Sequence, residues 1–287
     1  MIDYNDELLE YYKKQLKEHR TTINYDNEPR DYIDAFLIEQ KKQNSEGAST
    51  EFGEWSDLQL LGTVYDLFAA GTEAVSSTLT TFIFYMIHYP KIKQKIYEEI
   101  DRVIGREKAV TMSDQPKLPY FNACLLEAQR IITSVPINAF HRTFEEFVID
   151  EYTIPKGINI IPQFEAVHKD ETEFPGKCVF CKLNYVTTNV NQKIFKQLLD
   201  PWTFDPLRFL DEEMNYKKDE RVTPFSLGKR ACLGESLVRM ELFLFAATFA
   251  QNSDFQPEDP KNLPLFEFEY TITKNIKSFN VRLINRK

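Results

Sequence analysis

One cysteine stands where a glycine-containing loop runs into an apolar helix. Cys232 lies between Gly228 and Gly234 in the segment PFSLGKRACLGESLVRMELFLF, which begins at Pro224. A thiolate here would meet the positive end of the helix dipole and the free N–H groups of the first turn. A single thiolate suits axial ligation of haem iron better than zinc, which takes four ligands. The glycines leave room for a flat macrocycle, and Arg230 could pair with a propionate.

The same segment resembles the haem-binding signature of the cytochromes P-450, the haem-thiolate monooxygenases. The resemblance rests on Phe225-x-x-Gly228-x-Arg230-x-Cys232-x-Gly234, and the continuation GESLVRMELFLF is similar to the animal microsomal branch. At this chain's own residue frequencies, a random match has a probability on the order of one in 10⁵. The resemblance implies haem b as the cofactor, Cys232 as the axial ligand of its iron, and the other four residues as cofactor-binding.

Two further segments occur in the family's order. Glu127 and Arg130 are three residues apart in a predicted helix, so they share one helical face. That pattern alone more often marks a surface ion pair, but the resemblance implies a buried structural triad with Arg208 of the segment FDPLRF. His141 resembles the residue that donates to a haem propionate, although a lone histidine is more often structural.

A third segment, AGTE from residue 70, resembles the central-helix motif that lies over the haem and assists oxygen activation. The resemblance implies that Gly71 adjoins the cofactor and that Thr72 and Glu73 are catalytic, ordering water for proton delivery. The family's motif continues with threonine, whereas this chain has Ala74. The missing hydroxyl leaves Thr72, Ser76 and water as substitutes.

The elements that must position these residues are mainly helices. Apolar periodicity and helix start and stop signals predict a long central helix from about residue 56 to 88. Further helices are predicted at residues 8–20, 29–42, 90–104, 119–133 and 234–251. Short strands are expected between 135 and 161 and again from 266 to 284. The sequence therefore predicts a mainly α chain with small β elements, which the resemblance identifies as the C-terminal part of the cytochrome P-450 fold.

We expect residues 1–287 to form one partial cytochrome P-450 domain, with the haem-binding loop at 224–234. The resemblance begins near residue 25 and covers only the C-terminal half or so of the family. Residues 176–199 interrupt it and are interpreted as an insertion or a gene-model artefact. This segment holds Cys178 and Cys181, whose CxxC spacing could begin a zinc site, but no second pair follows.

Composition excludes several classes of protein. The chain has 35 Lys and Arg against 44 Asp and Glu, a formal net charge of −9, which argues against nucleic-acid binding by counterion release. Four cysteines are too few for a disulfide framework and indicate a reducing compartment. The longest apolar runs, 79–87 and 242–250, are shorter than the roughly 18 residues of a membrane span. We therefore expect no anchor within this chain.

The resemblance implies the insertion of one oxygen atom from dioxygen into an apolar small-molecule substrate. Electrons would come from NADPH through a flavoprotein reductase. The full-length family member would sit on the cytoplasmic face of the endoplasmic reticulum membrane, held by an N-terminal anchor. Two alternatives stay open. A haem-thiolate isomerase or peroxygenase needs no dioxygen proton relay, and a truncated non-catalytic fragment would bind no haem, or only another protein.

Overall fold

The mainly helical fold is confirmed. The computed structural model describes residues 2–46, 55–174, 203–271 and 273–286. The chain divides into two compact units, Met1–Glu73 and Ala74–Lys287. The predicted insertion, with Cys178 and Cys181, lies outside the described residues.

The first unit consists of helices around a small core. Its elements are α1 (Ile2–Thr22), α2 (Tyr32–Glu46) and the first half of α3 (Asp57–His88). Phe36, Leu37 and Leu60 form its buried apolar cluster. The backbone N–H of Gln59 donates to the Ser56 hydroxyl at 3.2 Å, as the predicted helix start requires.

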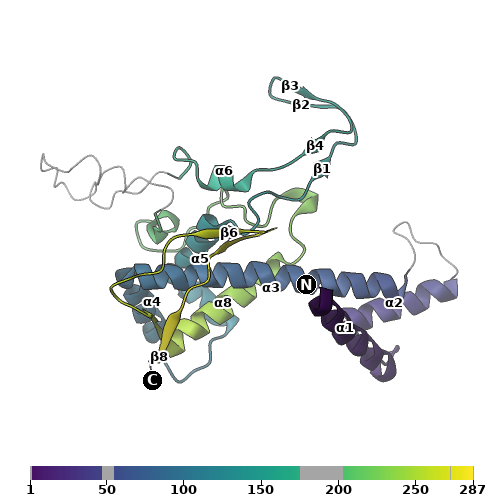
Figure 1. Ribbon diagram of the computed structural model, residues 1–287, viewed down its shortest axis with the longest axis horizontal. Helices are drawn as coiled ribbons and strands as arrows, with labels where there is room; N and C mark the ends of the chain where they lie inside the picture. The colour runs from purple at the N-terminus through teal and green to yellow at the C-terminus, as the bar shows by residue number, and fades with distance from the viewer. Residues whose placement is uncertain (1, 47–54, 175–202, 272, 287) are drawn as a thin grey trace, which may run out of the picture. The chain divides into compact units, whose positions relative to one another are not determined.

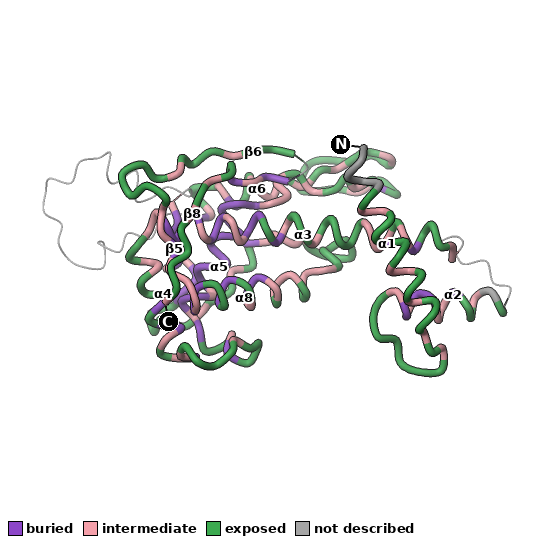
Figure 2. Tube along the Cα trace, turned by 60° about the horizontal axis from the view of Figure 1, so that its bottom comes forward, coloured by how far each residue is buried: buried purple, intermediate pink, exposed green. Residues whose placement is uncertain are grey.

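The second unit is built around α5, which is buried along almost its whole length (Figure 2). Helix α5 contacts both α4 and α8, and α4 also contacts α8. Their bounds are α4 (Pro90–Val103), α5 (Pro119–Ile132) and α8 (Glu235–Asn252). Phe121 of α5 makes edge contacts with Phe82 of α3 at 5.7 Å and Phe243 of α8 at 5.8 Å. Aromatic packing thus joins three helices that are far apart in the sequence.

A carboxylate from a neighbouring helix caps the start of α5. The N-cap residue Leu118 makes no side-chain cap. Instead, buried Glu99 of α4 accepts hydrogen bonds from the N–H groups of Tyr120 at 3.0 Å and Phe121 at 2.8 Å. These are among the N–H groups that a helix leaves unsatisfied in its first turn. Burial raises the pKa of the Glu99 carboxyl, and the two hydrogen bonds oppose this shift.

Among the described residues, four antiparallel strand pairs and several short helices complete the second unit (Figure 1). The pairs are β1 (His141–Arg142) with β4 (Asn159–Ile160), β2 (Phe147–Ile149) with β3 (Tyr152–Ile154), β5 (Ser253–Pro257) with β8 (Val281–Asn285), and β6 (Phe268–Tyr270) with β7 (Lys274–Ile276). The short helices are η1 (Met112–Lys117), α6 (Phe164–His168), η3 (Pro206–Phe209) and η4 (Gly228–Arg230). Strand β5 and helix α6 were not predicted.

The last strand ties the end of α8 to α4. Just beyond β8, the N–H of Arg286 donates to the carbonyl of Asn252 at 3.0 Å. Its guanidinium lies 2.9 Å from Asp101 of α4 and 3.8 Å from the ring centroid of Tyr97. One arginine thus joins three elements.

Helix α3 is long and apolar enough to cross a membrane, by length and composition alone. The lengths of the uninterrupted apolar runs did not predict this property of α3, because small Thr and Ser residues interrupt its apolar stretches. Its second half supplies Phe82, Phe84 and Met86 to the core of the second unit. That burial gives a separate reason for the apolar composition of this half.

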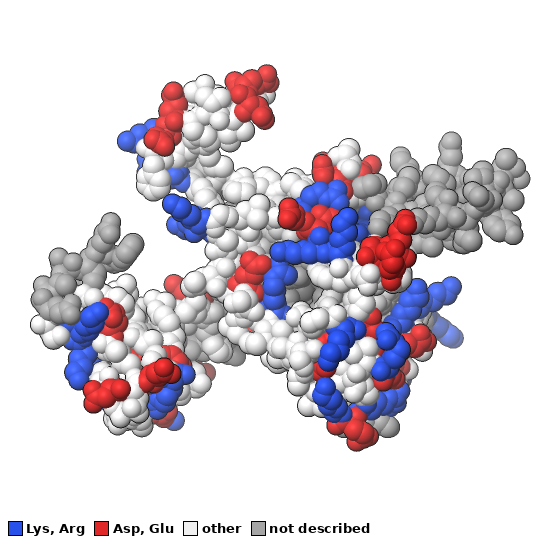
Figure 3. All heavy atoms as spheres, turned by 180° about the vertical axis from the view of Figure 1, so that it is seen from behind, with Lys and Arg blue, Asp and Glu red and all other residues white. Residues whose placement is uncertain are grey.

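Charged side chains of both signs are interspersed over the face shown in Figure 3. On that face, the described residues form no broad area of a single sign.

Candidate functional site

The loop that carries Cys232 folds back on itself. Ser226 and Gly228 both have positive φ, 66° and 74°, and the chain then makes the single turn of η4. The N–H of Cys232 donates to the carbonyl of Phe225 at 2.8 Å, and that of Ala231 donates to the carbonyl of Gly228 at 3.1 Å. These bonds fix the cysteine two residues before Gly234, the N-cap of α8.

Cys232 lies in an open stretch of the loop, with exposed leucines on both sides of it in the sequence. The cysteine is a free, exposed thiol. Leu227 is 71% exposed and Leu233 is 87% exposed on either side of it. A Cβ added at Gly228 or Gly234 would meet no atom within 4 Å. Large apolar side chains exposed beside a thiol and open glycines fit a flat apolar group that binds through one sulfur ligand, as haem does.

Helix α8 fastens the loop from the other side. The Arg239 guanidinium lies over the Phe225 ring, 4.8 Å from its centroid. Its Nε donates to Glu235 Oε1 at 2.8 Å. This stacking and ion pair connect the start of the loop to the first two turns of the helix.

The segment that carries His141 adjoins the loop. The amide of Asn138 donates to the hydroxyl of Ser226 at 3.2 Å. His141 is partly exposed, and its Nδ1 lies 2.8 Å from the carbonyl of Ala139. Arg230 is exposed, and the described part of the chain offers its guanidinium no hydrogen-bond partner.

Glu127, Arg130 and Arg208 lie together in the interior. Arg130 Nε and Nη2 donate to the two Glu127 carboxylate oxygens at 2.7 and 2.8 Å, and both side chains have no exposed surface. Arg208 Nε lies 3.5 Å from Glu127 Oε1, and its Nη1 donates to the carbonyl of Phe174 at 2.9 Å. The N–H of Asp205 also donates to Glu127, at 2.9 Å. One carboxylate therefore serves two guanidiniums and a backbone amide.

A buried histidine extends this network toward the cysteine loop. Arg130 Nη1 donates to the carbonyl of His168 at 2.6 Å. His168 Nε2 accepts the N–H of Thr223 at 3.0 Å, so Nδ1 carries the ring proton and donates to the Thr133 hydroxyl at 2.9 Å. The carbonyl of Thr223 then accepts the N–H of Ser226 at 3.1 Å. Burial and the nearby cations lower the pKa of His168 to about 4, which keeps the ring neutral.

Sequence reasoning missed His168, Asp205 and Phe174 as parts of this network. Asp205 was visible only as part of the segment around Arg208, and nothing local distinguishes His168 from a surface histidine. Their partners are backbone groups and side chains distant in sequence, which no spacing rule reveals.

The central-helix residues belong to the other unit. Gly71, Thr72 and Glu73 lie on α3 in the first unit, whereas Ala74 begins the second. Thr72 and Glu73 are exposed, and a Cβ added at Gly71 would meet no atom within 4 Å.

Removing the shared carboxylate should strongly destabilise the second unit. Glu127→Ala leaves two buried guanidiniums without their anion, so the free energy of unfolding should fall by about 3–5 kcal/mol in urea denaturation. The matched control is Glu173→Ala, which removes an exposed glutamate 3.4 Å from Arg221 and should cost less than about 1 kcal/mol. Equal losses for the two variants would contradict the buried network.

Acid should weaken the fold through His168. Its pKa of about 4 lies below the ordinary 6.5, so its contribution is complete above pH 6.5 and is lost as the pH falls toward 4. Urea denaturation at pH 7 and pH 5 should therefore show a smaller loss of stability for His168→Gln than for the parent chain. The same loss in the His168 variant and the parent would disprove this assignment.

Comparison with known proteins places the whole chain in one family. The cytochrome P450 family model matches residues 2–180 and 181–283. The chain is 36% identical to probable cytochrome P450 CYP36A1 of Caenorhabditis elegans over 98% of its own length and 52% of that protein. It is 38% identical to cytochrome P450 2C15 of Oryctolagus cuniculus, covering 90% of the chain and 61% of that protein. For cytochrome P450 2C20 of Macaca fascicularis, the identity is 40% over 88% of the chain and 46% of that protein.

The chain thus spans about half the length of these curated relatives. The family match covers both the cysteine loop and the Glu127 network, and it covers nearly every described residue. The chain belongs to the cytochrome P450 family, whose members carry haem.

Proposed function

We propose that this chain is part of a haem-thiolate monooxygenase that inserts one oxygen atom from dioxygen into an apolar small-molecule substrate. The observation that carries the proposal is the exposed Cys232 thiol, set between open glycines and exposed leucines at the start of α8. The electron donor is an NADPH-dependent flavoprotein reductase. The full-length protein acts at the cytoplasmic face of the endoplasmic reticulum membrane.

The loop and its neighbours supply the groups that haem requires. Cys232 would hold the haem iron through its sulfur, and Phe225, Gly228 and Gly234 would lie beside the cofactor. When bound, the haem supplies dioxygen activation, favoured by electron density from the cysteine sulfur.

Arg230 and His141 are the residues that bind the propionates. Arg230 is exposed with its donors available, as a bidentate carboxylate contact needs. In His141, Nδ1 must carry a proton because its neighbour, the Ala139 carbonyl, only accepts. A propionate would therefore meet the ring on its Nε2 side.

We assign proton delivery to residues of α3. Thr72 and Glu73 are exposed on this helix, where a hydroxyl and a carboxylate can order water and pass a proton toward the reacting oxygen. Gly71 precedes them and leaves open space beside the backbone.

Ala74 favours a second candidate, a haem-thiolate isomerase or peroxygenase. A methyl group stands where the family's motif has a hydroxyl, and such enzymes need no proton relay for dioxygen. The nearby hydroxyl of Thr78, one turn further along α3, already donates its proton to the Ala74 carbonyl at 3.0 Å.

The spectrum of the reduced, carbon-monoxide-bound haem tests the proposal. Haem-loaded parent chain should give the red-shifted Soret band of a thiolate ligand, and Cys232→Ala should abolish it, because no other thiol lies in the loop. Cys124→Ala, which changes a buried cysteine of α5, should keep the band. A band that survives in Cys232→Ala would refute the ligand assignment. A parent without the band would favour the non-catalytic fragment.

Substitution at Ala74 separates the two catalytic candidates. In a monooxygenase, Ala74→Thr restores a proton-donating hydroxyl and should raise the product formed per NADPH consumed. The measurement compares NADPH plus reductase with a hydroperoxide alone, for parent and variant. In an isomerase or peroxygenase, the hydroperoxide alone should support efficient turnover, and Ala74→Thr should give no gain in coupling.

A further inference from the structure

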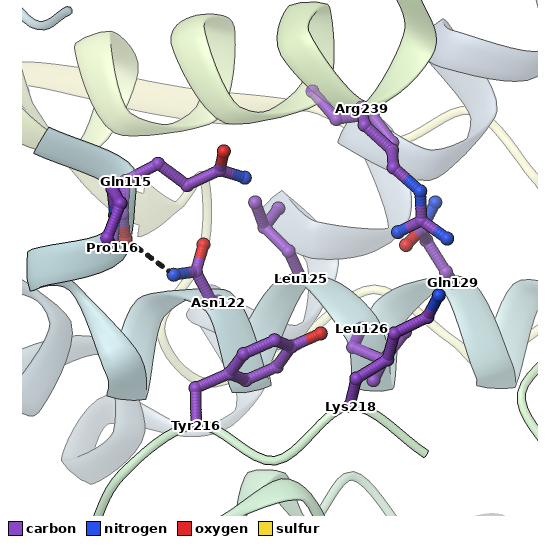
Figure 4. A pocket seen from close by; sticks show the side chains of 10 residues that line it. Gln115, Pro116, Asn122, Leu125, Leu126, Gln129, Tyr216, Lys218 and Arg239 are labelled. Carbon is purple, nitrogen blue, oxygen red and sulfur yellow. Dashed lines mark hydrogen bonds between the residues drawn. The ribbon is translucent and has the colours of Figure 1, made fainter. Parts of the chain in front are cut away.

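A cavity lies between helices α5 and α8, and none of residues 224–234 lines it. Its volume is about 370 Å³, within the range of small-molecule sites. It is lined by Gln115, Pro116, Asn122, Leu125, Leu126, Gln129, Tyr216, Lys218, Arg239 and Leu242. All ten belong to the second unit, and Figure 4 shows their side chains.

The middle of the cavity is apolar. Leu125 and Leu126 of α5 and Leu242 of α8 are buried side chains that form this part of its wall. The Tyr216 ring contributes a further face from the segment after η3 (Figure 4). A ligand in this space must therefore present an apolar body.

The lining of the cavity also includes the amide of Gln129. Gln129 is 7% exposed, and no hydrogen bond to its side chain is found among the described residues. Gln129, Arg239 and Lys218 all line the cavity, and Figure 4 shows their side chains toward one side of the view. Its amide therefore keeps hydrogen-bonding capacity for water or a ligand.

The lining also carries positive charge. Arg239 uses Nε on Glu235, at 2.8 Å, whereas its terminal amino groups have no hydrogen-bond partner among the described residues. Lys218 likewise makes no ion pair within the described residues, and none of the ten lining residues is acidic. A guanidinium edge, an ammonium and an amide together match the acceptors of one carboxylate.

We propose that this cavity binds a small carboxylate with an apolar body, with its carboxylate at Gln129, Lys218 and Arg239 and its apolar part against the three leucines. The ligand is distinct from the substrate of the haem site. The proposal does not depend on oxygenase activity, since all its groups lie between α5, α8 and the segment around Tyr216.

Calorimetric titration of the 287-residue chain with 4-phenylbutyrate tests the proposal. Its neutral amide, 4-phenylbutyramide, is the matched ligand control and should bind at least about tenfold more weakly, because it lacks the charge. Inorganic phosphate should bind more weakly than the phenyl carboxylate, because it lacks the apolar body. Equal affinity for the acid and the amide would overturn the role of charge, and equal affinity for phosphate would overturn the apolar part.

Two neighbouring lysines provide matched variants. Lys218→Glu should raise the Kd for 4-phenylbutyrate by about tenfold, whereas Lys217→Glu should change it by less than about twofold, because Lys217 does not line the cavity. Both side chains are exposed, so both variants should fold. Gln129→Met keeps the side-chain length, removes the amide, and should also weaken binding. Equal effects at positions 217 and 218, or no binding by the parent chain, would overturn the proposal.

Discussion

The second unit depends on one buried negative charge. Glu127 has no exposed surface, yet it accepts hydrogen bonds from Arg130 and from the N–H of Asp205, and it lies 3.5 Å from Arg208. Removing a carboxylate and two guanidiniums from water is costly, so this arrangement persists only because nearly every donor is satisfied. The carboxylate joins α5 to η3 and the segment around η3. Neither element can therefore shift without breaking bonds to Glu127.

That constraint also reaches the cysteine loop. From Glu127, hydrogen bonds run through Arg130 to His168, from His168 to Thr223, and from Thr223 to Ser226. Ser226 is the first residue of positive φ in the loop, so the buried network fixes the point at which the chain turns toward Cys232. A structural ion pair and a site for a prosthetic group are thus parts of one connected framework. Through this connection, the buried charge of Glu127 helps to fix the position of the loop that carries the exposed Cys232 thiol.

Local sequence signals predicted much of this fold, but they did not predict which segments far apart in the sequence contact each other. Periodicity and helix start and stop signals placed α3, α4, α5 and α8 within one residue at each end. Helix α1 begins six residues before its predicted start. The motif around Cys232 was equally visible, because its chemistry needs adjacent residues. By contrast, β5 was missed because its partner β8 comes much later in the chain. The cap by Glu99 and the role of His168 were not predicted, because both side chains bond to backbone groups that only the tertiary structure brings near them.

The pairing of β5 with β8 also has a consequence for synthesis. Ribosomes add about 5–20 residues per second, so Val281–Asn285 leaves the ribosome a few seconds after Ser253–Pro257. During that interval β5 has an unpaired edge, and the end of α8 lacks the bond from Arg286 to Asn252. We therefore expect the helix that begins beside Cys232 to reach its final packing only after translation of the last strand.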